Sequence, residues 1–136
     1  MKDSKVLVDT SVWIFALKKN FHPQIKERVE TLLRENIVVT LGLIRLELLG
    51  GAKTEKEFRR LRGLWEELTT IETSEYLWGK ASELAFYLRR NGLTVPHTDI
   101  LVAVAAIEAE VLLLHADSHF DLIAKHTELR AENLQV

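Results

Sequence analysis

The chain has 136 residues, of which 47% are hydrophobic and 28% charged, with a formal net charge of −2 at pH 7. This length suits a single folded domain over residues 1–136 that buries about two thirds of its unfolded surface. No apolar run reaches the roughly 18 residues that cross a bilayer, the N-terminus does not resemble a secretory signal, and there is no cysteine. We therefore expect a cytoplasmic protein without a membrane partner and without thiolate chemistry.

Apolar runs of strand length alternate with helical patterns along the chain. This alternation is typical of an α/β protein whose mainly parallel sheet is covered by helices on both faces. The first strand is predicted at 5–8. A short helix over 11–19 follows, with Thr10 or Ser11 as its cap. A second helix opens on a proline and runs over about 23–36.

The middle of the chain predicts one strand, two helices and a further short strand. Residues 37–40, with the sequence IVVT, are all β-branched and predict a strand. A short helix then ends near the glycine pair at 50–51. Residues 54–57 have the spacing of a capping box and open the next helix. A short strand is predicted at 70–72.

The last third of the chain begins with a long helix over 74–90, closed by the Asn-Gly pair at 91–92. Pro96 marks the start of another helix, which carries Asp99 in its first turn. Three elements complete the pattern: a buried strand at 111–115, a short helix at about 119–125 and an edge strand at about 130–134.

Four acidic residues lie where an α/β sheet presents functional groups. Asp9 and Asp117 each follow an apolar strand, Asp99 opens an apolar helix, and Glu47 interrupts another. Ligands of open α/β sheets bind beyond the carboxyl ends of the strands. Carboxylates held there would be partly desolvated and would repel one another, and a hard divalent cation offsets both costs. The sequence therefore predicts a site that holds Mg²⁺ or Mn²⁺.

Each of these acids also has a simpler interpretation. Asp9 and Asp117 could cap the helices that follow them, and Asp99 lies in a first turn, where the helix dipole favours an anion. Glu47 could face water from one side of its helix. The hypothesis of a shared site depends on the four acids together.

Four motifs carry a resemblance to a known family. They are VLVDTSVWI at 6–14, LELLGG at 46–51, HTDILVAVA at 97–105 and LLHADSHFD at 113–121. In order, spacing and flanking residues the chain resembles PIN-domain proteins, and in particular the VapC-type toxins of prokaryotic toxin–antitoxin pairs. The resemblance extends over essentially the whole chain.

This resemblance implies a three-layer α/β/α fold with a four- or five-stranded, mainly parallel sheet, and a metal-dependent endoribonuclease activity on RNA. It also implies a homodimer, and inhibition by a VapB-type antitoxin whose C-terminal arm fills the active-site groove. Thr10 or Ser11 matches the family's hydroxyl beside the first acid. The positions that match the family's catalytic and metal-binding quartet are Asp9, Glu47, Asp99 and Asp117.

The mechanism expected from this match is hydrolysis of an RNA phosphodiester. Asp9, Asp99 and Asp117 would hold the ion, and Glu47 would complete its shell or position the attacking water. Asp121 is either a supporting or fifth acid of the site or a capping partner of Ser118.

Several alternatives stay open at this point. His115 and His119 flank Asp117 with a spacing that a zinc site could use, although oxygen-rich surroundings favour Mg²⁺ or Mn²⁺. Other functions to weigh are an RNA-processing PIN nuclease without an antitoxin, a non-catalytic PIN-like interaction module and a phospho-receiver domain. A phospho-receiver domain needs a phospho-accepting aspartate after a central strand and a partnering lysine. It is disfavoured because the third acid of this chain, Asp99, opens a helix instead.

Overall fold

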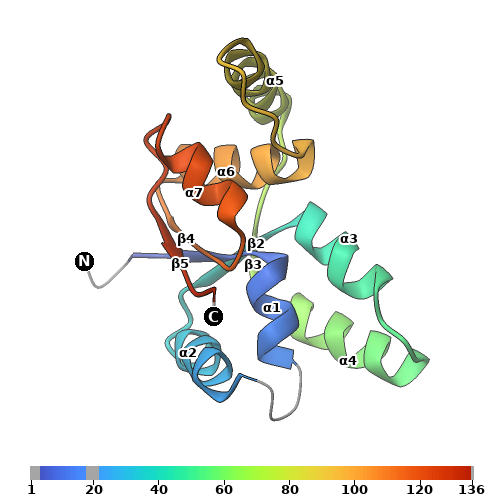
Figure 1. Cartoon of the computed structure of the whole chain (residues 1–136). Coiled ribbons are helices and arrows are strands. Elements are labelled where there is room, and N and C mark those ends of the chain that lie inside the picture. Colours follow the sequence, from blue (N-terminus) through green and yellow to red (C-terminus); the bar gives the residue numbers. More distant parts are fainter. Residues whose placement is uncertain (1–3, 18–21, 136) are drawn as a thin grey trace.

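Five parallel strands form the central sheet of the computed structural model, which describes residues 4–17 and 22–135 (Figure 1). The strand order is β3-β2-β1-β4-β5. The predicted α/β fold class with a mainly parallel sheet is therefore confirmed. The strands are β1 (Val6–Val8), β2 (Val38–Leu41), β3 (Thr69–Ile71), β4 (Leu112–His115) and β5 (Ala131–Asn133).

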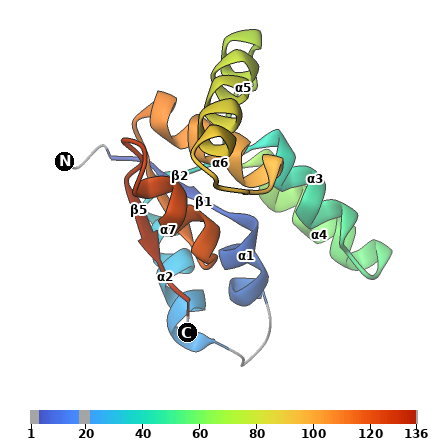
Figure 2. The same cartoon turned by 45° about the horizontal axis from the view of Figure 1, so that its top comes forward.

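Helices lie on both sides of this sheet. In Figure 1, α6 and α7 lie on one side and α1 and α2 on the other, while Figure 2 shows α3 and α4 extending together away from the sheet. The helices are α1 (Thr10–Leu17), α2 (Pro23–Arg34), α3 (Gly42–Gly50), α4 (Glu55–Glu66), α5 (Glu75–Arg90), α6 (His97–Ala109) and α7 (Ser118–Ala124).

The predicted helix ends agree with the structure, with small shifts. Thr54 caps α4 by accepting a hydrogen bond from the Glu57 backbone N–H, but the Glu57 carboxylate returns to the Lys53 N–H rather than to Thr54. Helix α5 ends at Asn91, and Gly92 takes a positive φ of 78°, which favours glycine. The predicted end of the first helix at Lys19 lies outside the described residues.

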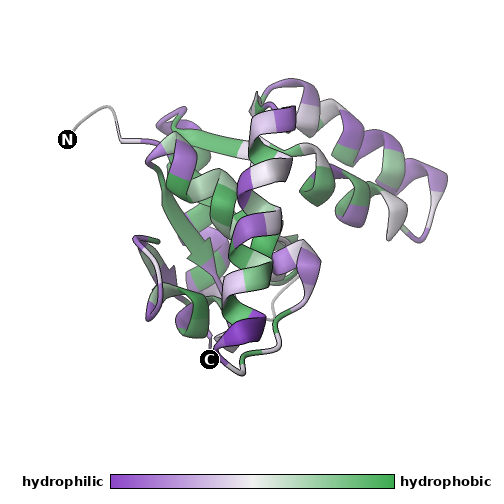
Figure 3. Ribbon diagram, turned by 90° about the horizontal axis from the view of Figure 1, so that it is seen from above, coloured by the Kyte–Doolittle hydropathy of each residue, from purple (hydrophilic) through white to green (hydrophobic). Residues whose placement is uncertain are grey.

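The core is built from the central strands and the helix that carries Asp99. Strands β1 and β4 are almost entirely buried, and α6 is buried from Ile100 to Ala106, so this stretch of the helix is apolar on every side. In Figure 3 the hydrophobic colour gathers toward the centre of the molecule. Trp13 and Trp65 pack against each other in the core with ring centroids 5.6 Å apart. Trp78 is 52% exposed and contributes instead to the surface of α5. Within 4–17 and 22–135, no helix is both long and apolar enough to cross a membrane.

Strand β1 lies at the centre of the sheet, and its two neighbours come from opposite ends of the chain. Val6 pairs with Val38 of β2 on one side and with Leu112 of β4 on the other. The chain leaves β1 toward one edge of the sheet and returns to β4 on the opposite side. At such a reversal, the carboxyl ends of two adjacent parallel strands open a crevice, which is where open α/β sheets bind ligands.

Candidate active site

Asp9 is the first residue after β1 and the most buried acid of the site, with 6% of its surface exposed. Its backbone N–H donates to the Leu114 carbonyl at 2.9 Å, which extends the pairing of β1 with β4. Its Oδ2 accepts hydrogen bonds from the Ser11 N–H at 3.0 Å and the Ser11 hydroxyl at 2.6 Å. The Ser11 oxygen itself accepts from the Ala116 N–H at 3.0 Å. One serine therefore ties the Asp9 carboxylate to the end of β4.

Asp117 lies two residues after β4 and is the N-cap of α7. Its Oδ1 accepts from the His119 N–H at 2.9 Å, and its own N–H donates to the His115 Nδ1 at 3.2 Å. The capping interpretation is thus correct for Asp117, and Asp9 makes the equivalent bond to the start of α1. In both residues, one carboxylate oxygen caps a helix, which leaves the carboxylate free to take part in a site as well.

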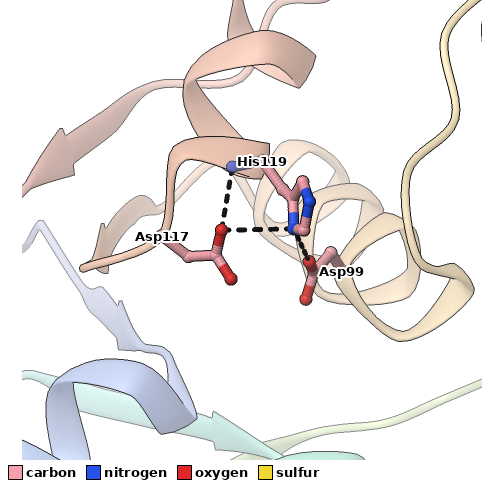
Figure 4. A group of neighbouring side chains, drawn as sticks. All are labelled: Asp99, Asp117 and His119. Atoms are coloured by element: carbon pink, nitrogen blue, oxygen red, sulfur yellow. Dashed lines mark hydrogen bonds and ion pairs between the residues drawn. The ribbon is translucent and has the colours of Figure 1, made fainter.

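Asp99 enters the same crevice from the first turn of α6, and His119 connects it to Asp117 (Figure 4). The His119 Nδ1 lies 3.1 Å from the Asp99 Oδ2 and 3.2 Å from the Asp117 Oδ1. One ligand atom from each of these three residues falls within 4.8 Å of the others. Residues from the starts of α6 and α7, which strand β4 separates in the sequence, are therefore brought together here.

The pKa values of the aspartates reflect their crowding. Burial, followed by the negative charges of Asp117 and Asp9, raises the pKa of Asp99 to about 6, while His119 opposes the shift. Burial also raises the pKa of Asp9, against the hydrogen bonds from Ser11. Because Asp99 responds to both other carboxylates, all three aspartates lie within one partly desolvated region.

Glu47 lies apart from this group. It is exposed on α3, and its Oε1 accepts a hydrogen bond from the hydroxyl of Thr10, the residue next to Asp9. The expectation of a partly desolvated Glu47 is therefore wrong, because the flanking Leu46 does not bury it: Leu46 is itself 69% exposed. Glu47 contributes to the rim of a groove of about 380 Å³, whose apolar lining includes Ile14, Leu17, Leu48 and Leu61.

Asp121 and the two histidines have different partners from those expected. Asp117, not Ser118, caps α7, so the capping-box interpretation of Asp121 is wrong. The Asp121 carboxylate accepts from the Asn133 side-chain amide at 2.7 Å and lies 3.6 Å from the buried His115 Nε2. His119 faces the acids instead, so the histidines contact separate groups.

His119 is the residue of this site that sequence reasoning missed, because it entered only as half of a zinc pair with His115. The signal was its position two residues after Asp117, in the first turn of the helix that Asp117 caps. A side chain at this position lies close to the capping residue, so it can contact the carboxylate of that residue.

The donor set of the group fits a hard divalent cation. Two carboxylates and one imidazole nitrogen converge within 4.8 Å, and the Asp9 carboxylate lies close enough to raise the pKa of Asp99. Mg²⁺ and Mn²⁺ prefer carboxylate oxygens as ligands. The positive charge of such an ion would offset the excess negative charge of these carboxylates. Asp99, Asp117 and His119 supply the converging ligand atoms, and Asp9 is the neighbouring carboxylate that could complete the set.

Comparison with known proteins places this geometry in a family. The model of the PIN domain matches residues 6–126. The chain belongs to the PIN-domain family. Ribonuclease VapC51 of Mycobacterium tuberculosis is 31% identical over 126 residues, which cover 90% of this chain and 88% of the relative. Ribonuclease VapC11 of the same species is 28% identical and covers 96% and 99% of the two chains. The resemblance to VapC-type PIN proteins is confirmed.

Solved structures with the same fold include two toxin–antitoxin complexes. VapBC2 from Rickettsia felis, bound to a promoter DNA fragment, gives a TM-score of 0.77 at 21% identity and covers 96% of this PIN chain and 98% of that chain. VapBC-1 from nontypeable Haemophilus influenzae gives 0.73 at 22% identity and covers 94% and 96%. At these identities the likeness establishes the fold.

The raised pKa of Asp99 predicts that Asp99→Asn stabilises the metal-free protein at pH 7.5. The amide keeps the side-chain shape and removes a charge that Asp117 and Asp9 repel. A shift from 3.8 to about 6 corresponds to about 3 kcal/mol at most. Solvent screening at this partly exposed group reduces the expected gain in unfolding free energy to about 1–2 kcal/mol. Urea unfolding in the presence of EDTA measures it.

The control is a second pH and a matched variant. The folded state binds the Asp99 proton more tightly than the unfolded state, so wild-type stability rises as pH falls from 7.5 toward 4.5. The advantage of Asp99→Asn should shrink over the same range. Glu108→Gln, an exposed substitution on the same helix, should show neither effect. Loss of stability in Asp99→Asn at pH 7.5 would mean that the carboxylate is a structural requirement of α6.

Proposed function

We propose that this PIN-domain protein is a metal-dependent endoribonuclease that hydrolyses RNA phosphodiester bonds and is the toxin of a VapBC-type pair. The observation that carries the proposal is the convergence of Asp9, Asp99 and Asp117 in the crevice beyond β1 and β4. The ribonuclease relatives at 31% and 28% identity support the reaction class, and the VapBC complexes of the same fold support the pairing.

In the proposed reaction, the three aspartates hold Mg²⁺ or Mn²⁺. When bound, the ion would polarise a phosphate oxygen and lower the pKa of water at neutral pH. Asp9 is fixed by two hydrogen bonds to its Oδ2. Glu47, which accepts a hydrogen bond from the hydroxyl of Thr10 beside Asp9, would orient the attacking water or accept its proton.

Two other functions remain to be separated from this one by experiment. An RNA-processing PIN nuclease would use the same acids but would lack an inhibitory partner. A non-catalytic PIN-like module would have no use for Asp9 and Asp99, whose charged forms burial disfavours. That electrostatic cost favours a cation-dependent role.

The reaction itself is tested with a mixed RNA pool. We expect cleavage with Mn²⁺ or Mg²⁺ and none with EDTA, and a loss of at least about 100-fold in Asp99→Asn and in Asp117→Asn, because each removes a charged ligand. Mapping of the cut ends gives the position and chemistry of cleavage. The exposed Glu108→Gln serves again as the control and should cleave as wild type does. Undiminished cleavage in EDTA, or in both aspartate variants, would rule out this mechanism.

The groove beside Glu47 suits the inhibitory partner. Its lining is mainly apolar, and three charged side chains also lie on it: the carboxylates of Glu47 and Glu57 and the ammonium of Lys53. An antitoxin segment with apolar residues would fill the groove, and a following Arg or Lys could reach the acidic crevice. A basic side chain there would compensate the carboxylates in place of the ion, so that partner and metal compete.

Ile14→Asp is expected to weaken inhibition by a co-expressed VapB-type partner by at least about tenfold. Ile14 lines the groove yet is 43% exposed. An aspartate at this position therefore disfavours binding of an apolar partner segment without burying a charge in the core. The partner concentration that halves RNA cleavage is measured relative to the rate of each free variant. Leu46→Asp, exposed on α3 but outside the groove lining, is the control. Equal inhibition of both variants would place the partner elsewhere.

We also propose that the protein is a homodimer, with helix α5 as the contact surface. Four aromatic side chains are exposed on this helix: Tyr76, Trp78, Phe86 and Tyr87. A helix with so much exposed aromatic surface is typical of an interface. Trp65 of α4 is buried in the core and takes no part in this surface.

Replacement of Trp78 and Phe86 together by serine should shift the protein from dimer to monomer. Removing two exposed aromatics takes apolar area from the contact while leaving the core unchanged. Sedimentation velocity over a range of micromolar concentrations measures the change. Phe58→Ser, which alters an exposed aromatic on α4, should leave the dimer intact. A monomeric wild type at the highest concentration would disprove the proposed dimer.

A further inference from the structure

His115, the last residue of β4, is completely buried and contacts the phenyl ring of Phe120 at a centroid distance of 5.0 Å. A buried imidazole is costly unless its two nitrogens have partners, so its surroundings indicate what it does. The proposed reaction gives this histidine no role. Its contacts nevertheless lead directly to Asp117.

The hydrogen bond from Asp117 identifies the form of the ring. The Asp117 backbone N–H donates to the His115 Nδ1 at 3.2 Å, so this nitrogen carries the lone pair and the proton of the neutral ring is on Nε2. The Asp121 Oδ1 lies 3.6 Å from Nε2. That distance exceeds a hydrogen bond, but the negative charge faces the Nε2 proton and favours the same tautomer.

Asp121 is itself held by the neighbouring strand. The Asn133 side-chain amide donates to its Oδ2 at 2.7 Å, and Asn133 pairs with His115 in the register of β5 with β4. The Asn133 side-chain Oδ1 accepts in turn from the Gln135 N–H at 2.7 Å. A series of contacts therefore runs from β5 through Asp121 and His115 to the backbone of Asp117.

We infer that His115, whose Nε2 faces the Asp121 carboxylate, is a positioning residue that fixes Asp117 for metal binding. Three hydrogen bonds restrain Asp117: its N–H donates to the His115 ring, its carbonyl accepts from the Phe120 N–H, and its Oδ1 accepts from the His119 N–H. With 37% of its side chain exposed, Asp117 has little packing to orient it, so these bonds hold it in place. The inference deepens the proposed nuclease function and rests on it.

Two substitutions separate positioning from simple space filling. In His115→Asn, the side-chain oxygen can accept from the Asp117 N–H, as Nδ1 does, although the contact with Asp121 is lost. In His115→Leu, the volume is largely kept but the acceptor is removed. Loss of a partner of this kind typically costs about 10–100-fold in metal affinity.

Mn²⁺ affinity is measured by calorimetry without RNA, together with the unfolding midpoint and with kcat and KM for RNA cleavage. We expect His115→Leu to lose about 10–100-fold in Mn²⁺ affinity and to lower kcat more than it changes KM. His115→Asn should recover most of the affinity. Wild-type affinity in a folded His115→Leu, or equal losses in both variants, would overturn the inference.

A measurement on the wild type decides the case if His115→Leu does not fold. ¹⁵N NMR of the histidine rings should give the Nε2–H tautomer for His115, with a coupling from the Asp117 amide to Nδ1. A ring protonated on Nδ1 would overturn the inference. If the wild type binds Mn²⁺ but cuts no RNA, the nuclease proposal fails, and the comparison of Mn²⁺ affinities still decides whether His115 positions Asp117.

Discussion

Mutual repulsion among three buried or half-buried carboxylates is the constraint around which this end of the molecule is organised. Asp9, Asp99 and Asp117 meet beyond the ends of β1 and β4, and burial together with the charges of Asp117 and Asp9 raises the pKa of Asp99 to about 6. The surrounding groups reduce that repulsion without removing it. Ser11 donates twice to Asp9, and His119 lies between Asp99 and Asp117. The remaining negative charge is what makes the crevice attractive to a cation.

Helix capping and ligand binding are not alternatives in this protein. Asp9 and Asp117 each use a carboxylate oxygen to accept a backbone N–H at the start of the following helix. The same bond that satisfies the helix also fixes the direction of the carboxylate. A capping role, taken alone as the simpler explanation, is therefore part of how the site is held in shape.

The sequence predicts much of the fold because its strands and helix ends depend on local patterns. The positions of Asp9 and Asp117 follow from strand ends, and parallel pairing then places them side by side. Other features depend on packing between distant segments. Leucine neighbours of Glu47 indicated burial, yet α3 extends away from the sheet and leaves Glu47 exposed. The contacts of His119 and His115 depend on rotamers and on the place of β5, which no local pattern encodes.

The Ser11 oxygen has a consequence for the synthesis of the protein. It receives the Ala116 N–H from 105 residues further along the chain, and Asp9 similarly donates to Leu114. The first strand can therefore complete neither its pairing nor its acidic crevice until residue 116 has been translated. A growing polypeptide on the ribosome carries Asp9 without Asp99 or Asp117 beside it until those residues have been made. For a proposed ribonuclease, that order of assembly means that the nascent chain lacks its complete acidic site until residue 117 has been added and can fold back beside β1.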